Sequence, residues 1–166
     1  MCDNIYIGAM GNDLRSEIKQ TRPFASLAQE AYLNLGRTWA RLEHEMAEAL
    51  KAHGITPTQY NVLRILKGAG SKGLCRSEIM DRMIARVPDA TRLLDRMEAA
   101  GLIDRARDAD DRRFVTTRIT DEGLRLVAEA EGPVMALHAT QFDVVAERDL
   151  QQLVRTLELV RSTGGE

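Results

Sequence analysis

Residues Ala85–Thr120 have the sequence ARVPDATRLLDRMEAAGLIDRARDADDRRFVTTRIT, and this stretch decides the fold. Apolar residues at helical spacing predict a short amphipathic helix from Pro88 to Ala100, with Leu93, Leu94 and Met97 inward. Two segments of alternating polarity follow, Leu102–Arg107 and Phe114–Ile119, and they predict the paired strands of a β-hairpin. The polar segment 108–113 between them predicts the tip of that hairpin.

Five further helices are predicted around this stretch from apolar residues at steps of three and four. They cover about residues 23–54, 57–67, 76–84, 121–141 and 146–161. Pro23 predicts the start of the first, Thr56 and Pro57 predict an N-cap and a first helical residue, and Gly132-Pro133 predicts a break or bend. The order α-α-α-α-β-β-α-α indicates a mainly α protein of the α+β winged-helix class.

Four regions follow from this order. Residues 1–22 are predicted to be a flexible or short-helical extension, and 23–54 a long helix whose apolar stripe extends to a second subunit. Residues 55–120 form the predicted winged helix-turn-helix lobe, and 121–166 the terminal helix pair.

The composition limits the class of protein. A chain of 166 residues fits one domain, or one domain plus an oligomerisation element. Its two cysteines, Cys2 and Cys75, make no disulfide framework, which indicates a reducing cytoplasm. There is no apolar run long enough for a membrane span, and the N-terminus lacks the pattern of a signal peptide.

The charge is unevenly distributed. The net charge is −2, yet residues 72–118 carry eleven Lys/Arg against nine Asp/Glu. The asymmetry is modest, so any DNA binding must depend on a few well-placed arginines, and the acidic remainder would suppress indiscriminate binding.

The two short helices 76–84 and 88–100 have helix-turn-helix spacing, in which the second helix enters the major groove of DNA. Arg92 then can fork onto a guanine or clamp a phosphate, and Arg96 one turn later faces the backbone. An arginine at the hairpin tip suits a narrow minor groove. Asp111 is predicted to brace a wing arginine, either Arg105 or Arg107. A solvated charged loop remains the simpler interpretation of the same tip.

The segment from Gly73 resembles the MarR (multiple-antibiotic-resistance regulator) family of winged helix-turn-helix repressors. The resemblance is carried by the motifs Gly73-Leu74, Ser77-Glu78, Thr91-Arg92, Asp95-Arg96-Met97-Glu98, Gly101-Leu102-Ile103, Asp111-Arg112-Arg113 and Ile119-Thr120-Asp121-Glu122-Gly123. It covers about residues 24–162. The chain departs from the family pattern at Ile84, where glycine is frequent, and at Pro88-Asp89, where serine or threonine is usual.

The resemblance implies a homodimer that binds double-stranded DNA on a near-palindrome, with half-sites about one turn (~10 bp) apart. It implies that Arg92 works in the major groove and that Arg112 or Arg113 enters the minor groove. The predicted DNA-binding residues are Ser77, Pro88, Asp89, Ala90, Thr91, Arg92, Arg96, Asp111, Arg112 and Arg113. Asp89 can accept a hydrogen bond from a cytosine amino group, which leaves the operator sequence open.

The resemblance also implies a small aromatic acid as effector. An arginine beside an aromatic ring suits a phenolic carboxylate. The candidate ligand-binding residues on the first two long helices are Arg37, Trp39, Arg41, His44, Tyr60 and Arg64. For each of them a structural role, in the core, the dimer interface or an ion pair, is the alternative.

Two other functions stay open. Cys75, at the entry to the helix 76–84, is a candidate redox sensor, or it simply replaces a capping threonine. A winged helix can also serve as a protein-interaction module. An enzyme is not expected, because no metal-ligand spacing, phosphate loop or nucleophile elbow is present. The sequence predicts no cofactor and no metal.

Overall fold

The computed structural model describes residues 13–107 and 115–162. Its elements are α1 (Leu14–Glu17), α2 (Leu27–Lys51), α3 (Pro57–Ala69), a 3-10 turn (Gly70–Lys72), β1 (Leu74–Cys75), α4 (Arg76–Asp81), α5 (Ala90–Ala99), β2 (Ile103–Arg107), β3 (Val115–Ile119), α6 (Asp121–Gln141) and α7 (Glu147–Ser162). The mainly α winged-helix prediction is confirmed. By their internal contacts, residues 1–42 and 43–166 form two compact units.

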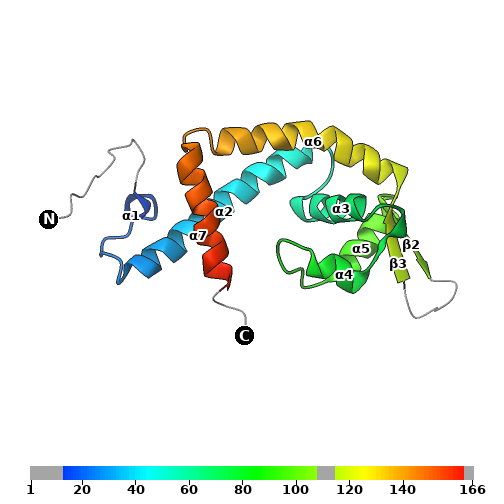
Figure 1. The fold of residues 1–166 in the computed structure, drawn as a ribbon, viewed down its shortest axis with the longest axis horizontal. Helices are drawn as coiled ribbons and strands as arrows, with labels where there is room; N and C mark the ends of the chain where they lie inside the picture. The colour runs from blue at the N-terminus through cyan, green and yellow to red at the C-terminus, as the bar shows by residue number, and fades with distance from the viewer. Residues whose placement is uncertain (1–12, 108–114, 163–166) are drawn as a thin grey trace. The chain divides into compact units, whose positions relative to one another are not determined.

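The second unit holds the helix-turn-helix and the wing. Helices α3, α4 and α5 lie together beside the β2–β3 hairpin (Figure 1). The sheet is antiparallel in the order β1-β3-β2, with Arg105 opposite Thr117 and Leu74 on the other side of Thr117. Sequence reasoning missed β1, because a two-residue strand carries no alternating pattern and forms only where the β3 edge is available.

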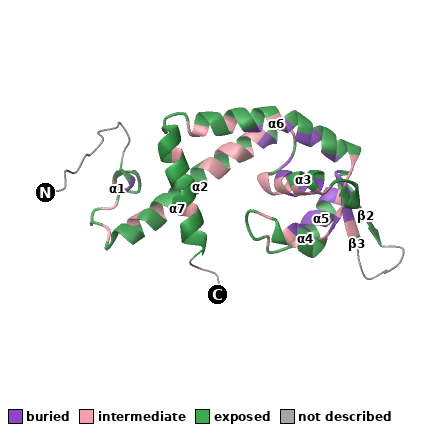
Figure 2. Ribbon diagram, viewed as in Figure 1, coloured by how far each residue is buried: buried purple, intermediate pink, exposed green. Residues whose placement is uncertain are grey.

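The core of this unit joins residues from every part of it. The fully buried side chains come from α2, α3, α4, α5, β2, β3 and α6, and Figure 2 shows purple on α3, α5 and α6. Those with the largest volumes are Leu50, Leu63, Leu66, Ile79, Leu94, Met97 and Ile103. The predicted inward residues of the fourth predicted helix, Leu93, Leu94 and Met97, are all buried.

Glycine permits two close approaches in this core. Gly73 has φ +68° and lies so close to β3 that a Cβ would be 2.5 Å from the Thr117 carbonyl oxygen. Gly123, in the first turn of α6, packs against the carbonyl of Leu102 and the side chain of Ile119. Thr120 holds the same junction, because its N–H donates to Leu102 O (3.2 Å) and its hydroxyl donates to Gly101 O (2.7 Å). The end of the wing is therefore fixed to the start of α6.

Several helix boundaries differ from the predictions. Helix α2 begins at Leu27 and not near Pro23, because the Ser26 hydroxyl accepts from the Gln29 N–H at 3.1 Å and caps the helix there. Helix α4 ends at Asp81, three residues early, and α5 begins at Ala90 and not at Pro88, because Asp89 caps it.

Helix α6 is the other difference. It continues through Pro133 to Gln141, so no break occurs. The Thr56 cap of α3 is confirmed, with Gln59 completing a capping box.

Candidate nucleic-acid interface

The recognition helix α5 has one buried face and one exposed face. Its buried face is Leu93, Leu94 and Met97, and residues Thr91, Arg92, Asp95 and Arg96 are exposed. This division follows from the 3.6-residue period, because the core residues and the exposed residues alternate in steps of three and four. The exposed face therefore offers a hydroxyl and two guanidinium groups to a DNA groove.

Asp89 organises the first turn of this helix. Its Oδ1 accepts from the Arg92 N–H at 3.0 Å, and its Oδ2 lies 3.2 Å from Arg92 Nε. The Arg92 side chain is still 83% exposed. Arg96 Nε donates to the Arg92 carbonyl at 3.2 Å, so both arginines are oriented along the helix. Pro88 precedes the cap, and Ala90, the first helical residue, is half-buried.

A residue that sequence reasoning missed connects the two helices of the helix-turn-helix. Arg76 Nη1 donates to Thr91 Oγ1 at 3.0 Å. The turn between these helices is held as well, since Ile84 N–H donates to Asn61 Oδ1 of α3 at 3.1 Å. Nothing in the spacing of Arg76 and Thr91, fifteen residues apart, signals this contact.

The N-terminal turn of α4 contains Ser77 and Cys75. Ser77 is exposed, and its hydroxyl lies 3.0 Å from the Cys75 sulfur. Cys75 occupies the N-cap position, and its N–H donates to Glu78 Oε2 at 2.7 Å. This hydrogen bond holds the pKa of the Glu78 carboxyl below its ordinary value. Cys75 is a free thiol and half-buried.

The wing is tied to the recognition helix by Arg105 of β2. Its Nε donates to Glu98 Oε2 at 2.8 Å, and its Nη2 lies 2.5 Å from both Glu98 Oε2 and Asp95 Oδ1. The Glu98 hydrogen bond is the main cause that raises the pKa of Arg105 above its ordinary value. Arg105, offered above as a partner of Asp111, is therefore bound to α5. The predicted tip residues Asp111, Arg112 and Arg113 lie outside the described residues.

Two of the predicted ligand-binding residues contact each other. Tyr60 is buried, and its hydroxyl accepts from Arg64 Nη1 at 3.3 Å. The Arg64 guanidinium lies 5.9 Å from the Tyr60 ring centroid and 3.7 Å from Glu131 Oε1 of α6. The hydrogen bond to Tyr60 is the main cause that raises the pKa of Arg64. Lys67 also pairs with Glu131 at 3.2 Å, so this cluster joins α3 to α6.

The other four ligand candidates lie on α2. His44 is exposed within the second unit. Arg37, Trp39 and Arg41 belong to the first unit, where Arg37 Nε pairs with Glu17 Oε2 at 3.3 Å and Trp39 is 52% exposed. Trp39 is therefore not a core residue of the single chain.

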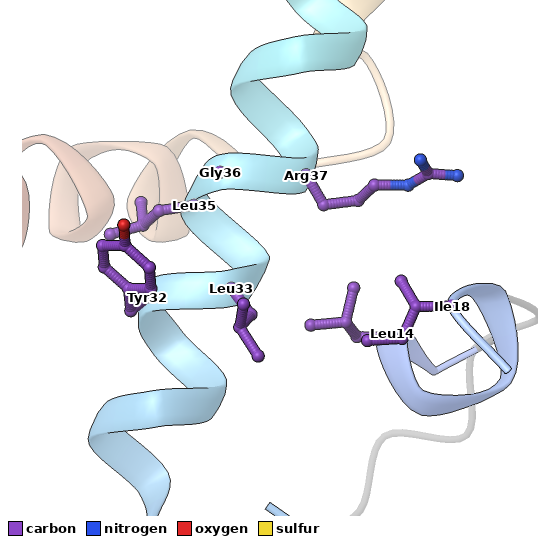
Figure 3. Close-up of a pocket in the computed structure, with 7 residues that line it drawn as sticks. All are labelled: Leu14, Ile18, Tyr32, Leu33, Leu35, Gly36 and Arg37. Carbon is purple, nitrogen blue, oxygen red and sulfur yellow. The ribbon is translucent and has the colours of Figure 1, made fainter. Parts of the chain in front are cut away.

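The first unit contains an open, mostly apolar pocket of about 540 Å³ between α1 and α2. Figure 3 shows Leu14 of α1 and Ile18, the residue just after α1, facing Leu33 and Arg37 of α2. The lining residues are Leu14, Ile18, Tyr32, Leu33, Leu35, Gly36 and Arg37. Among the ligand candidates, Arg37 is the one that this pocket includes.

None of the helices in the described part of the chain is long and apolar enough to cross a lipid bilayer. Within residues 13–107 and 115–162, no group of three His, Cys, Asp or Glu side chains is placed to hold a metal ion.

Comparison with known proteins places this geometry among bacterial transcriptional regulators. The model of the MarR family matches residues 53–113, which include the helix-turn-helix and the first strand of the wing. The HTH-type transcriptional repressor MdtR of Bacillus subtilis (strain 168) is 32% identical over 126 residues, covering 76% of this chain and 80% of the relative.

Two solved structures extend the comparison to three dimensions. A MarR transcription factor from Planctomyces limnophilus matches with a TM-score of 0.64 at 39% identity, covering 82% of this chain and 99% of that chain. CouR from Rhodococcus jostii RHA1, in a structure bound to p-coumaroyl-CoA, matches with a TM-score of 0.68 at 26% identity, covering 82% and 95%.

Proposed function

The chain belongs to the MarR family of DNA-binding transcriptional regulators, and from this premise we propose that it is a repressor that binds a near-palindromic operator as a homodimer. The observation that carries the proposal is the exposed face of α5, where Thr91, Arg92 and Arg96 lie opposite the buried Leu93, Leu94 and Met97. A helix anchored on one side and polar on the other fits the width of the major groove. A bacterial regulator of this kind works in the cytoplasm, beside the chromosome.

In this proposal the specific contacts with DNA come from two elements, the recognition helix α5 and the wing. Arg92 of α5 forks onto a guanine or clamps a phosphate, and Arg96 contacts the sugar-phosphate backbone. The wing supplies Arg112 or Arg113 to the minor groove, with Asp111 as its brace. Arg105 supports this arrangement, because its bonds to Asp95 and Glu98 fix the wing strand to the recognition helix.

The homodimer is supported by the apolar side chains that the single chain leaves exposed on α2 and α7. Helix α7 has no buried residue in the single chain (Figure 2). Its apolar residues recur at helical spacing, as Leu150, Leu153, Val154, Leu157 and Val160. On α2, Tyr32 and Trp39 are 75% and 52% exposed. A second copy that covers these faces would remove the apolar surface from water, and two recognition helices would then meet the two half-sites.

We further propose that a small aromatic acid releases the repressor. The support is chemical: CouR was solved with p-coumaroyl-CoA, and this chain pairs a guanidinium with an aromatic ring at Arg64 and Tyr60. That cluster joins α3 of the DNA-binding lobe to α6, so a ligand that takes Arg64 away from Glu131 would act on the junction between them. A ligand would release the repressor by changing the separation of the two DNA-binding lobes of the dimer. This requires that the ligand bind the dimer with different affinity at the two separations.

The test is selection of bound duplexes from a random DNA library, with Arg92→Ala and Arg113→Ala beside the wild-type protein. We expect wild type to recover a palindrome with half-sites about one helical turn apart, and both variants to lose it. Affinity for that duplex should fall by about 10³- to 10⁵-fold between ~50 and ~200 mM salt if 6–10 phosphates are contacted. No enrichment from protein that was unfolded and refolded to strip ligand would contradict the proposal.

A further inference from the structure

The hydrogen bond between Arg76 and Thr91 affects whether the Thr91 hydroxyl donates or accepts a hydrogen bond on the proposed DNA-binding surface. It joins the first residue of α4 to the second residue of α5 over 3.0 Å, from Arg76 Nη1 to Thr91 Oγ1. Both residues are exposed, and Thr91 lies on the same face of α5 as Arg92. The contact therefore lies on the surface that the proposed function assigns to DNA.

The direction of this bond follows from the chemistry of the two groups. A guanidinium carries five N–H donors and no acceptor, so Thr91 Oγ1 must accept from Arg76. A hydroxyl has one hydrogen, which rotates to the best remaining partner. Among the described residues, no hydrogen bond takes the Thr91 hydrogen to a backbone carbonyl. The neighbouring Asp89 carboxylate is already engaged by the Arg92 N–H and Nε. Within the described residues, the Thr91 hydrogen therefore has no recorded acceptor and can be donated to a group outside the chain.

We propose that Arg76 is a positioning residue that occupies one of the two acceptor lone pairs of Thr91 Oγ1 and so biases the Thr91 hydroxyl toward donating a hydrogen bond to DNA. The inference rests on the proposed function, because it concerns the same interface. Without Arg76, the Thr91 hydroxyl can either donate or accept, and it accommodates either kind of DNA group. With Arg76 in place, one of the two acceptor lone pairs of Thr91 Oγ1 is taken, so the hydroxyl favours a hydrogen-bond acceptor at the position it faces.

DNA offers that acceptor in two places. In the major groove, guanine presents N7 and O6, adenine presents N7 and thymine presents O4, whereas cytosine presents only the N4 donor. A Thr91 donor that faces a base therefore discriminates against cytosine at that position. A phosphate oxygen is an acceptor of the same chemistry but carries no base identity.

The experiment uses the full chain and the operator recovered by the library selection. Binding is measured by fluorescence anisotropy for wild type, Arg76→Met, Thr91→Val and the double variant, on the operator and on duplexes with single base-pair changes. Arg76→Met keeps the length of the side chain and removes its donors, and Thr91→Val keeps the shape and removes the hydroxyl. Arg76→Lys is the conservative variant, because an ammonium group is also a donor without an acceptor.

Thr91→Val should weaken operator binding by roughly fivefold, the fold-change of one ordinary hydrogen bond, and Arg76→Met should weaken it by less, because its Thr91 hydroxyl can still donate. The double variant should bind the operator with the same affinity as the single variant that binds it more weakly, because both changes act on the same interaction. Arg76→Lys should keep the wild-type base preference that Arg76→Met loses. Because both side chains are exposed, the melting temperature of every variant should stay within about 2 °C of wild type.

Two controls separate this role from a general effect of charge. Arg82, an exposed arginine just after α4, is changed to Met alone and together with Thr91→Val. The fold-losses in operator affinity from Arg82→Met and from Thr91→Val should multiply in the double variant. A base-facing Thr91 is recognised by loss of discrimination against cytosine at one position. A phosphate-facing Thr91 is recognised by a single methylphosphonate that weakens binding of wild type most, of Arg76→Met less, and of Thr91→Val not at all. Either result supports the proposal.

Multiplying losses for Arg76→Met and Thr91→Val would overturn the inference, because Arg76 would then act on DNA by itself. An Arg76→Met protein with unchanged affinity and base preference would overturn it as well. Failure of the wild-type protein to select any duplex would instead overturn the proposed function, so the two failures are distinguishable.

Discussion

Gly123 shows at the residue scale how a backbone approach decides the outcome of a substitution. It lies in the first turn of α6, where its N–H donates to Thr120 Oγ1 at 3.1 Å. A Cβ there would fall inside van der Waals contact of the Leu102 carbonyl oxygen and would meet Ile119 at 2.8 Å. Glycine is a poor helix former, so its presence here is explained by this packing and not by helix propensity.

We predict that Gly123→Ala lowers the free energy of unfolding by about 1–3 kcal/mol, because the added methyl group overpacks the junction between the wing and α6. Urea denaturation followed by circular dichroism measures it. Gly68→Ala in α3 is the matched control, since a Cβ there meets nothing within 4 Å. The control should be stabilised by up to about 1 kcal/mol. Equal shifts in both variants would contradict the packing argument.

Asp89 is the residue whose role the sequence and the structure describe differently. Sequence reasoning considered it as an acceptor for a cytosine amino group. In the structure its carboxylate caps α5 and pairs with Arg92. Aspartate is among the preferred N-cap residues, so the identity of the residue fits this structural role. The cap also holds Arg92 near the start of the helix, which orients the proposed major-groove contact.

At the scale of elements, the Arg105 side chain holds β2 against α5. Its side chain is 23% exposed, whereas the carboxylates of Asp95 and Glu98 are 51% and 38% exposed. Solvent screens the two carboxylates, so the pairs contribute less than buried ones would. The planar guanidinium nevertheless spans both carboxylates, which an ammonium group cannot do with the same geometry.

We predict that Arg105→Ala lowers the free energy of unfolding by about 1 kcal/mol, because its charge-assisted hydrogen bonds to two partly solvated carboxylates are lost. Arg105→Lys should recover part of this loss. A double-mutant cycle with Glu98→Gln, measured by urea denaturation, should give a coupling of about 0.5–1 kcal/mol. Arg125→Ala, whose pairs with Glu122 and Glu129 lie on the exposed surface of α6, is the control and should change stability little. Zero coupling between Arg105 and Glu98 would refute the prediction.

At the scale of the whole molecule, the single chain leaves the apolar stripe of α7 uncovered. Leu153, Val154 and Val160 are 39%, 49% and 58% exposed, and no residue of this helix is buried. A helix that buries nothing has little tertiary stabilisation, because short isolated helices are marginal in water. The stripe is therefore the surface on which the proposed homodimer depends.

We predict that wild type sediments at twice the 18.5 kDa mass of one chain. Changing both Leu153 and Val160 to Lys should raise the dimer dissociation constant by at least about 100-fold, because each lysine forfeits ~1.5–3 kcal/mol of apolar burial. Analytical ultracentrifugation over a concentration series measures this constant. Lysines at Gln151 and Gln152, on the polar side of α7, are the control. If lysines at Leu153 and Val160 change the dimer dissociation constant no more than lysines at Gln151 and Gln152 do, the dimer interface lies elsewhere.

The sequence by itself determined the elements that depend on local physical chemistry. The 3.6-residue period indicated the helices, alternation indicated β2 and β3, and Thr56-Pro57 marked the start of α3 correctly. The buried face of α5 was also predicted residue by residue. These signals are local, since they come from neighbours within one or two turns of the chain.

Only the tertiary structure decided which distant side chains meet. The bonds from Arg76 to Thr91, from Arg105 to Glu98 and from Arg64 to Glu131 each depend on how two elements pack. The short strand β1 likewise exists because β3 offers it an edge. Such contacts leave no periodic trace in the sequence, because packing sets their geometry through space and many side chains of the same charge are equally available along the chain.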